Sequence, residues 1–278
     1  LFKGTASRSA RDIAEQIEDV GGSLNAWTSR ETTVFHARVL AGDLPLAVEL
    51  IADLVNAPAF DEGELAKERD VVLSEIGEAL DTPDDLVFDH SQAIAFPGQS
   101  LGRPILGTEQ SLAGLGREAL AGWLAGRYRA PALVLAAAGK VDHDALVQQA
   151  EGLFGQVAAD AAPPAEGARW EGGAQLDQKR GEQLHVVLAH EAPRLLADDH
   201  YAAQLFAMAL GGGMSSRLFQ ELREERGLAY SVSASVVPHH DTGVLSLYFA
   251  AQPGDGQQAL ELLRRVSAET AETLSPAE

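Results

Sequence analysis

The sequence predicts an α+β fold made of two related domains, each a sheet with helices packed on it, and the second domain is expected to be incomplete. Three observations predict this fold. Helical and strand-like periods both occur, without the strict strand–helix–strand alternation of a doubly wound sheet. Residues 158–175 are dense in Ala, Pro and Gly, which is typical of a linker. The order of elements after this linker loosely repeats the order before it.

The length agrees with this organisation, because 278 residues suffice for two domains of roughly 100–200 residues each. We expect a first domain over residues 1–157 and a linker over residues 158–178. The second domain then covers residues 179–278 and is a related repeat that is shortened at its C-terminus.

The elements of the first half follow from caps and periodicity. Ser9 is the expected N-cap of a helix that carries Ile13 and Ile17 on one face, and Gly21-Gly22 ends it. The further elements expected here are strands at 23–29 and 32–40 and helices at 43–55, 62–80, 84–95, 117–128 and 144–154. The continuous apolar run PALVLAAA predicts a buried strand over residues 131–138.

The second half contains the same two kinds of period. The elements expected there are a strand at 184–189, helices at 198–210 and 216–226, strands at 230–237 and 245–251, and a final helix at 256–274. The run Gly211-Gly212-Gly213 separates two of these helices. It lacks the residues that complete a phosphate-binding loop, so it indicates either a close backbone approach or a mobile loop.

Composition excludes several classes of protein. The 41 acidic residues outnumber the 21 basic ones, giving a formal net charge of -20, which argues against a general binder of nucleic acid backbones. There is no Cys, so disulfides, thiolate nucleophiles and Cys-ligated zinc are excluded. No apolar run approaches the roughly 18–20 residues of a membrane span.

Two carboxylates stand out on the expected helix over residues 62–80. Its apolar stripe consists of Leu65, Val72, Ile76, Ala79 and Leu80. Glu68 and Glu75 lie two turns apart on the flank of that stripe, where we expect them to be half-buried. A half-buried carboxylate needs a cation or hydrogen-bond donors. The partner is either Arg69 or another neighbour in the fold, or else a metal ion with one carboxylate as ligand and the other behind it.

The remaining chemistry-bearing residues leave the site open. The eight His residues form neither His-Glu-x-x-His nor His-x-x-Glu-His, so the sequence by itself does not complete a zinc site. Arg223 and Tyr230 are seven residues apart across a helix-to-strand break at Gly227. They are either a surface Arg and a strand aromatic, or two donors aimed at a substrate carbonyl.

Six segments, spread in order along most of the chain, resemble the insulinase/pitrilysin/mitochondrial processing peptidase family of inverted zincins, most closely its short bacterial and organellar branch. The matching segments are Leu1–Thr5 (LFKGT), Ile17–Glu31 (IEDVGGSLNAWTSRE), Glu68–Glu75 (ERDVVLSE), Leu101–Thr108 (LGRPILGT), Ala136–His143 (AAAGKVDH) and Ser215–Tyr230 (SSRLFQELREERGLAY).

The resemblance implies a Zn²⁺-dependent metalloendopeptidase. In the family, a His-x-x-Glu-His motif lies directly before the segment matching Leu1–Thr5, and it supplies two zinc ligands and the general base. This sequence lacks the motif, and the full family unit has a longer second domain, so we expect the chain to be truncated at both ends. Without the motif it is expected to be inactive by itself. The resemblance assigns Glu75 as the third zinc ligand and Glu68 as the family's second acidic residue.

The resemblance also implies how substrate is held. Asn25, Ala26 and Thr28 match an edge strand that binds peptides or unfolded segments as an added strand inside a closed chamber. Arg223 and Tyr230 match a second-domain pair that reaches the scissile bond. Together with Glu68, the family's second acidic residue, they are the expected catalytic residues.

The partners follow from the same resemblance. The family pair acts on the zinc of another half or subunit, which implies a homodimer or a heterodimer with a family member. The alternative is a non-catalytic family subunit, such as a processing-peptidase partner or a respiratory-complex core-like protein. The compartment stays open, with a bacterial cytoplasm or periplasm favoured by the branch.

Overall fold

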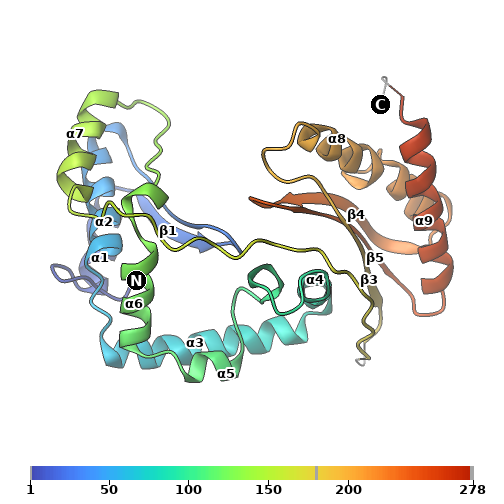
Figure 1. Ribbon diagram of the computed structural model, residues 1–278, viewed down its shortest axis with the longest axis horizontal. Helices are drawn as coiled ribbons and strands as arrows, with labels where there is room; N and C mark the ends of the chain where they lie inside the picture. Colours follow the sequence, from blue (N-terminus) through green and yellow to red (C-terminus); the bar gives the residue numbers. More distant parts are fainter. Residues whose placement is uncertain (1, 179–180, 276–278) are drawn as a thin grey trace. The chain divides into compact units, whose positions relative to one another are not determined.

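The computed structural model describes residues 2–178 and 181–275 (Figure 1). Leu1, the first residue of the segment LFKGT, and the expected start of the second domain at 179 lie outside the described residues. The chain divides into two compact units, unit 1 with Leu1–Ile76 and Ile105–Ala165, and unit 2 with Gly77–Pro104 and Glu166–Glu278. Both units combine helices with antiparallel sheets, so the α+β class is confirmed.

Unit 1 begins with helix α1, Ala10–Asp19, whose caps are those that the sequence predicts. The Ser9 side chain accepts a hydrogen bond from the Asp12 backbone N–H, and the Asp12 carboxylate accepts one from Ser9 N–H in return. Ile13 and Ile17 are buried. Gly21 follows the helix at φ +66°, a backbone conformation that residues other than glycine rarely adopt.

The sheet of unit 1 is a hairpin of β1, Ser23–Thr28, and β2, Thr33–Arg38. The strands are antiparallel, with Asn25 opposite His36 and Thr28 opposite Thr33. Within the described residues, these two strands pair only with each other. Each of them therefore has one edge whose backbone groups are not paired with another strand.

Helices form the rest of unit 1. They are α2, Leu44–Asn56, the first part of α3, Glu62–Asp81, the short α5, Glu109–Ala113, then α6, Arg117–Arg127, and α7, His143–Phe154, with single 3₁₀ turns at Ala41–Asp43 and Ala130–Ala132. Helix α2 carries the centre of the core, where Leu50 and Leu54 are fully buried. The short helix α5 was not predicted, because five residues are too few to show a helical period.

The strand predicted over residues 131–138 is wrong for the described structure. Its first two residues belong to the 3₁₀ turn Ala130–Ala132, and the others belong to no helix or strand. Val134 is 91% exposed and Leu135 is 40% exposed. A strand is defined by the neighbour that completes its hydrogen bonds, and in the part of the chain that is described no strand lies alongside this segment.

Unit 2 contains a three-stranded antiparallel sheet in the order β3–β5–β4. The strands are β3, Leu184–Glu191, β4, Ala229–Pro238, and β5, Gly243–Ala251. Its helices are α4, Pro83–Ala95, α8, His200–Gly211, the π-helical segment η4, Phe219–Glu225, and α9, Gly256–Thr273. The 3₁₀ turn Ser100–Gly102 follows α4.

The two faces of this sheet are covered by different helices. Leu247 and Phe249 of β5 are buried in one core with residues of α8, η4 and α9. Tyr248 has the opposite parity along the strand, and its ring contacts Phe88 of α4 at 5.3 Å between centroids. At Gly211 an added Cβ would lie 2.4 Å from the Ala234 backbone nitrogen, so the glycine run serves a close approach of α8 to β4.

The segment expected as a linker, 158–178, contains no helix or strand. Arg127 Nη1 donates to the carbonyl of Pro163 at 2.9 Å within unit 1. Gln99 and Arg169 exchange two hydrogen bonds within unit 2, at 2.7 and 2.8 Å. The domain boundaries drawn from the sequence remain a prediction.

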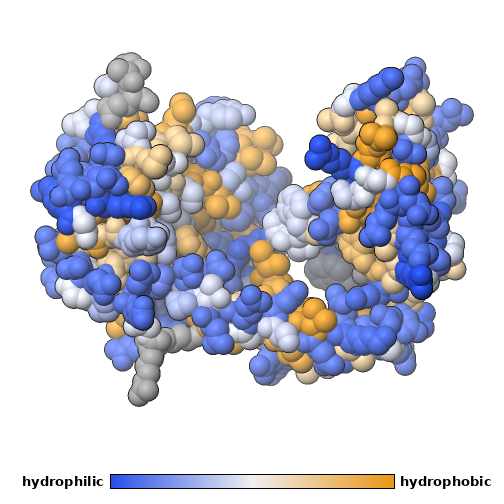
Figure 2. Space-filling view, turned by 180° about the vertical axis from the view of Figure 1, so that it is seen from behind, coloured by the Kyte–Doolittle hydropathy of each residue, from blue (hydrophilic) through white to orange (hydrophobic). Residues whose placement is uncertain are grey.

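The outer surface reflects the composition. Hydrophilic residues cover most of the face shown in Figure 2, with hydrophobic residues in separate groups among them. In the described part of the chain, no helix combines the length and the apolar character that a membrane crossing requires.

Candidate functional site

Glu68 lies on α3 and forms an ion pair with Lys3. The distance between Lys3 Nζ and Glu68 Oε2 is 3.1 Å, and the two side chains are 45% and 47% exposed. Arg69 is not the partner, because its Nη2 donates to the carbonyl of Leu115 at 2.7 Å. Of the alternatives that the sequence leaves open, a cation elsewhere in the fold is the one observed for Glu68.

Glu75 is exposed, which corrects the half-buried position predicted for it. Ile76 is the buried residue of α3, and Leu80, expected in the same stripe, is 45% exposed. Successive helical residues point about 100° apart, so a stripe this narrow leaves the neighbour of Ile76 in solvent. Among the described residues, the Glu75 carboxylate has no hydrogen bond or ion pair.

These carboxylates do not by themselves form a zinc site. In residues 2–178 and 181–275 there is no group of three His, Asp or Glu side chains placed to hold a metal ion. A catalytic zinc is held by three protein ligands. Glu75 has the free carboxylate that a ligand needs, whereas Glu68 is already paired with Lys3. Among the described residues, Glu75 therefore suits one of the three protein ligand positions, and the other two have no assigned residue.

Asn25, Ala26 and Thr28 lie together on β1, as predicted. The Asn25 side chain is exposed, and its Oδ1 accepts a hydrogen bond from Ala26 N–H at 2.8 Å. The Thr28 and Thr33 hydroxyl oxygens face each other across the hairpin at 3.4 Å. Because β1 pairs only with β2 in the described structure, its other edge can accept an extended peptide.

Arg223 and Tyr230 are brought together in unit 2. The Arg223 guanidinium carbon lies 5.3 Å from the centre of the Tyr230 ring and 4.8 Å from that of Phe219. Tyr230 is 70% exposed and the Arg223 side chain is 41% exposed. The helix predicted here is a π-helix over Phe219–Glu225, a form that is often found at functional sites. The sequence of residues 216–226 contains nothing that distinguishes a π-helix from an α-helix.

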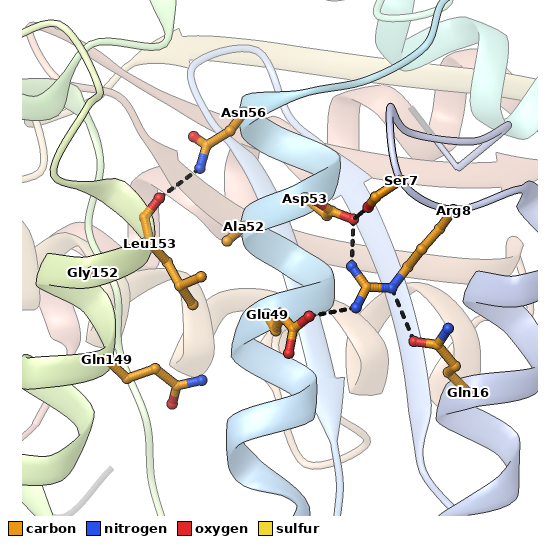
Figure 3. Close-up of a pocket in the computed structure, with 10 residues that line it drawn as sticks. All are labelled: Ser7, Arg8, Gln16, Glu49, Ala52, Asp53, Asn56, Gln149, Gly152 and Leu153. Atoms are coloured by element: carbon orange, nitrogen blue, oxygen red, sulfur yellow. Dashed lines mark hydrogen bonds and ion pairs between the residues drawn. The ribbon is translucent and has the colours of Figure 1, made fainter.

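A cavity of about 580 Å³ in unit 1 holds charged residues that sequence analysis missed (Figure 3). The Arg8 guanidinium donates to Asp53 and Glu49 of α2, and its Nε donates to Gln16 at 2.9 Å. Ser7 Oγ also donates to Asp53, at 2.6 Å. These partners are far apart in sequence, so no local motif predicts them. Every one of these groups is satisfied within the protein, which indicates a structural role.

The Asp53 carboxyl has a lowered pKa. Burial favours its neutral form, but hydrogen bonds from Ser7, Arg8 and Thr5 and the Arg8 charge outweigh burial and hold its pKa below the usual value. The carboxylate therefore stays ionised throughout the neutral range and fixes the segment before α1 to α2.

Two solved structures have the same fold. A crystal structure of a peptidase M16 inactive domain from Pseudomonas fluorescens has a TM-score of 0.90 at 22% identity, covering 98% of this chain and 67% of that chain. A protease from Helicobacter pylori has a TM-score of 0.85 at 19% identity, covering 95% of this chain and 67% of that chain. At this level of identity the likeness establishes the fold.

Sequence relatives are more closely similar. A protein of Mycobacterium leprae (strain TN), named an uncharacterized zinc protease, is 42% identical over 98% of this chain. The uncharacterized zinc protease YmxG of Bacillus subtilis (strain 168) is 36% identical over 99% of this chain. The chain spans 62% of the first of these relatives and 66% of the second.

Two family models match consecutive parts of the chain. The model described as Insulinase (Peptidase family M16) matches residues 1–109, and the one described as Peptidase M16 inactive domain matches residues 114–278. The matches meet near the middle of the chain and together cover almost all of it. The chain therefore belongs to the insulinase family of peptidases, peptidase family M16.

Proposed function

We propose that this chain is part of a zinc-dependent endopeptidase that cleaves peptides or unfolded segments. One observation carries the proposal, the 42% identity over 98% of this chain to a relative named a zinc protease. The free carboxylate of Glu75 and the unpaired edge of β1 support it, because the first suits a metal ligand and the second suits an extended peptide.

The residues take distinct roles in this proposal. Backbone groups of β1 around Asn25 and Ala26 bind the peptide as an added strand, so the enzyme places few demands on side chains. Arg223 and Tyr230 donate hydrogen bonds to the carbonyl that is attacked. Glu75 is one ligand of the metal. Glu68, which is paired with Lys3, is not a ligand and helps to orient the groups around the metal.

The quaternary structure is part of the proposal. Glu75 belongs to unit 1, whereas Arg223 and Tyr230 belong to unit 2. We propose that the Arg223–Tyr230 pair serves the metal site of a partner subunit, in a homodimer or in a heterodimer with a family member. The net charge of -20 argues against nucleic acid as a further partner.

The test is zinc content and peptide hydrolysis in the full-length protein that contains this chain. Glu75→Gln should lose zinc and chelator-sensitive hydrolysis, because an amide is a poorer zinc ligand than a carboxylate. Glu78→Gln is the matched control, since Glu78 is exposed on the same helix less than one turn away. Equal zinc in the wild type and Glu75→Gln would refute the ligand role.

A second candidate is a non-catalytic family subunit. The observation that favours it is the match of residues 114–278 to the model described as Peptidase M16 inactive domain. A wild-type full-length protein that binds no zinc and hydrolyses no peptide would select this candidate. The 278-residue chain alone is expected to be inactive under either proposal, because Glu75 is its one assigned ligand.

A further inference from the structure

A second cavity of unit 1, of about 250 Å³, adjoins the residues assigned above. Its walls are aliphatic side chains of α3 and α6 and three aromatic rings, namely Leu65, Leu120, Leu124, Phe60, Trp123 and Tyr128. We propose that this cavity binds one apolar side chain of the peptide substrate. The assignment of a peptide as ligand rests on the proposed function, whereas the apolar character of the site rests on the cavity itself.

The size of the cavity selects a small occupant. Pockets for drug-sized molecules have volumes of about 300–1,000 Å³, and this cavity is smaller. It suits one Leu-sized or Phe-sized side chain that projects from a larger ligand. A peptide held by its backbone provides such a side chain at every second residue on one face.

Each charged residue that lines the cavity has a partner within the protein. Glu68 pairs with Lys3 at 3.1 Å, and Glu64 pairs with Lys67 at 2.6 Å. Asp61 Oδ1 accepts the backbone N–H of Glu64 at 3.0 Å. A charged ligand entering here would lose water, and a cation would also have to compete with Lys3, Lys67 and the Glu64 backbone N–H for these carboxylates, which is unfavourable. An uncharged, apolar occupant does not incur this desolvation penalty.

The aromatic wall is held in place. Arg127 lies over the Trp123 ring at 5.0 Å, and the same guanidinium donates to the carbonyl of Pro163 at 2.9 Å. Phe60 has φ +47°, an unusual backbone conformation for a bulky residue. Strained residues of this kind are concentrated at binding sites, where the surrounding structure maintains them. The backbone conformation of Phe60 is therefore a second observation, separate from the shape of the cavity, that points to a binding site here.

The cavity lies near the hairpin that contains the predicted peptide-binding strand. Tyr128 lines the cavity, and its hydroxyl is close enough to the Thr33 side chain for that side chain to affect its pKa. Thr33 stands opposite Thr28 in the hairpin. Burial raises the pKa of Tyr128, so its hydroxyl is neutral at physiological pH. Glu68 lines another side of the same cavity. A peptide on β1 therefore has a pocket for one side chain beside the strand end at Thr28.

The experiment is an NMR titration of the ¹⁵N-labelled 278-residue chain with blocked amino acids. The chain has three Trp residues, so it gives three indole N–H signals, and Trp123→Phe identifies the one from the cavity. N-acetyl-leucinamide and N-acetyl-phenylalaninamide should shift the Trp123 signal saturably and leave Trp27 and Trp170 unchanged. N-acetyl-glycinamide and N-acetyl-lysinamide should bind at least about tenfold more weakly, a difference typical of apolar pockets.

Two variants test whether the cavity itself is responsible. Leu120→Ala removes part of its wall and should weaken N-acetyl-leucinamide binding by about tenfold. Leu115→Ala is the control, because Leu115 lies nearby in the chain, is 41% exposed and does not line the cavity. Equal effects of the two variants would contradict the assignment.

The remaining outcomes separate this inference from the proposed function. A Trp123 signal that stays unchanged, or N-acetyl-lysinamide binding as tightly as N-acetyl-leucinamide, overturns the apolar site. So does a silent Trp123 signal in the full-length protein, since the cavity would then be covered there. Saturable binding in a full-length protein that contains no zinc would instead uphold the pocket and refute the peptidase.

Discussion

The guanidinium of Arg223 lies over the ring of Tyr230, with 5.3 Å between its carbon and the ring centre. Phe219 holds the same group at 4.8 Å. A cation stacked on aromatic faces keeps its N–H groups at the edge of a plane, where they can bind a carbonyl or carboxylate oxygen. The Tyr230 ring is thereby fixed while its hydroxyl remains accessible, because the residue is 70% exposed.

This geometry predicts the effect of Tyr230→Phe in the full-length protein. The ring and its contact with Arg223 are retained, so folding should be unchanged. Loss of one donor to a developing oxyanion typically lowers turnover by about 10²–10³-fold. Tyr201→Phe is the control, because Tyr201 is also a highly exposed tyrosine of unit 2. Unchanged kcat in Tyr230→Phe would remove the hydroxyl from the site.

The proposed exchange of residues between subunits predicts complementation. Glu75→Gln and Arg223→Ala should each be inactive as full-length proteins, and mixed dimers formed by co-refolding should recover part of the peptide hydrolysis. In a mixed dimer, one chamber combines an intact metal ligand with an intact Arg223–Tyr230 pair. Absence of recovery in dimers shown to be mixed would mean that the pair is not supplied by the partner.

The Lys3–Glu68 ion pair predicts a different result for Glu68→Gln. Both side chains are nearly half exposed, so the loss of stability should stay below about 1 kcal/mol. Zinc affinity should fall by about 10–100-fold, as for groups that act behind a metal ligand. Glu15→Gln, which breaks the exposed Arg11–Glu15 pair at 2.6 Å, controls for loss of a surface ion pair. Zinc titration of the full-length variants measures the difference, and equal affinities would contradict it.

The lowered pKa of Asp53 predicts an acid-dependent contribution to stability. The group is ionised more easily in the folded than in the unfolded chain, so its contribution is complete above the unfolded pKa of about 4 and is lost as the pH falls below it. Asp53→Asn should cost about 1–3 kcal/mol at neutral pH, since the Arg8 clamp loses its main acceptor.

The urea midpoint of the 278-residue chain, measured from about pH 7 down to about pH 3, checks this prediction. The difference between the wild type and Asp53→Asn should shrink as the pH falls. Asp70→Asn, at an exposed position of α3, should give a small and nearly constant difference. A gap for Asp53→Asn that persists at the lowest pH would contradict the assigned pKa direction.

Local chemistry was sufficient to predict many of the elements. The cap at Ser9 and the glycine at Gly21 defined α1, because both act through the backbone of their immediate neighbours. The apolar-rich runs of β4 and β5 likewise predicted their strands, and in β5 residues on both faces are buried. The family motifs also point to Arg223 and Tyr230, whose side chains are in contact in the fold.

Tertiary structure decided what depends on a neighbour. Residues 131–138 have the composition of a buried strand, yet no strand pairs with them in the described chain, because composition cannot supply a hydrogen-bonding partner. Glu75 faces solvent while Glu68 meets Lys3, although both flank the same predicted stripe. Helical periodicity gives the direction of a side chain, whereas burial and charge pairing depend on residues that the fold brings from far along the sequence.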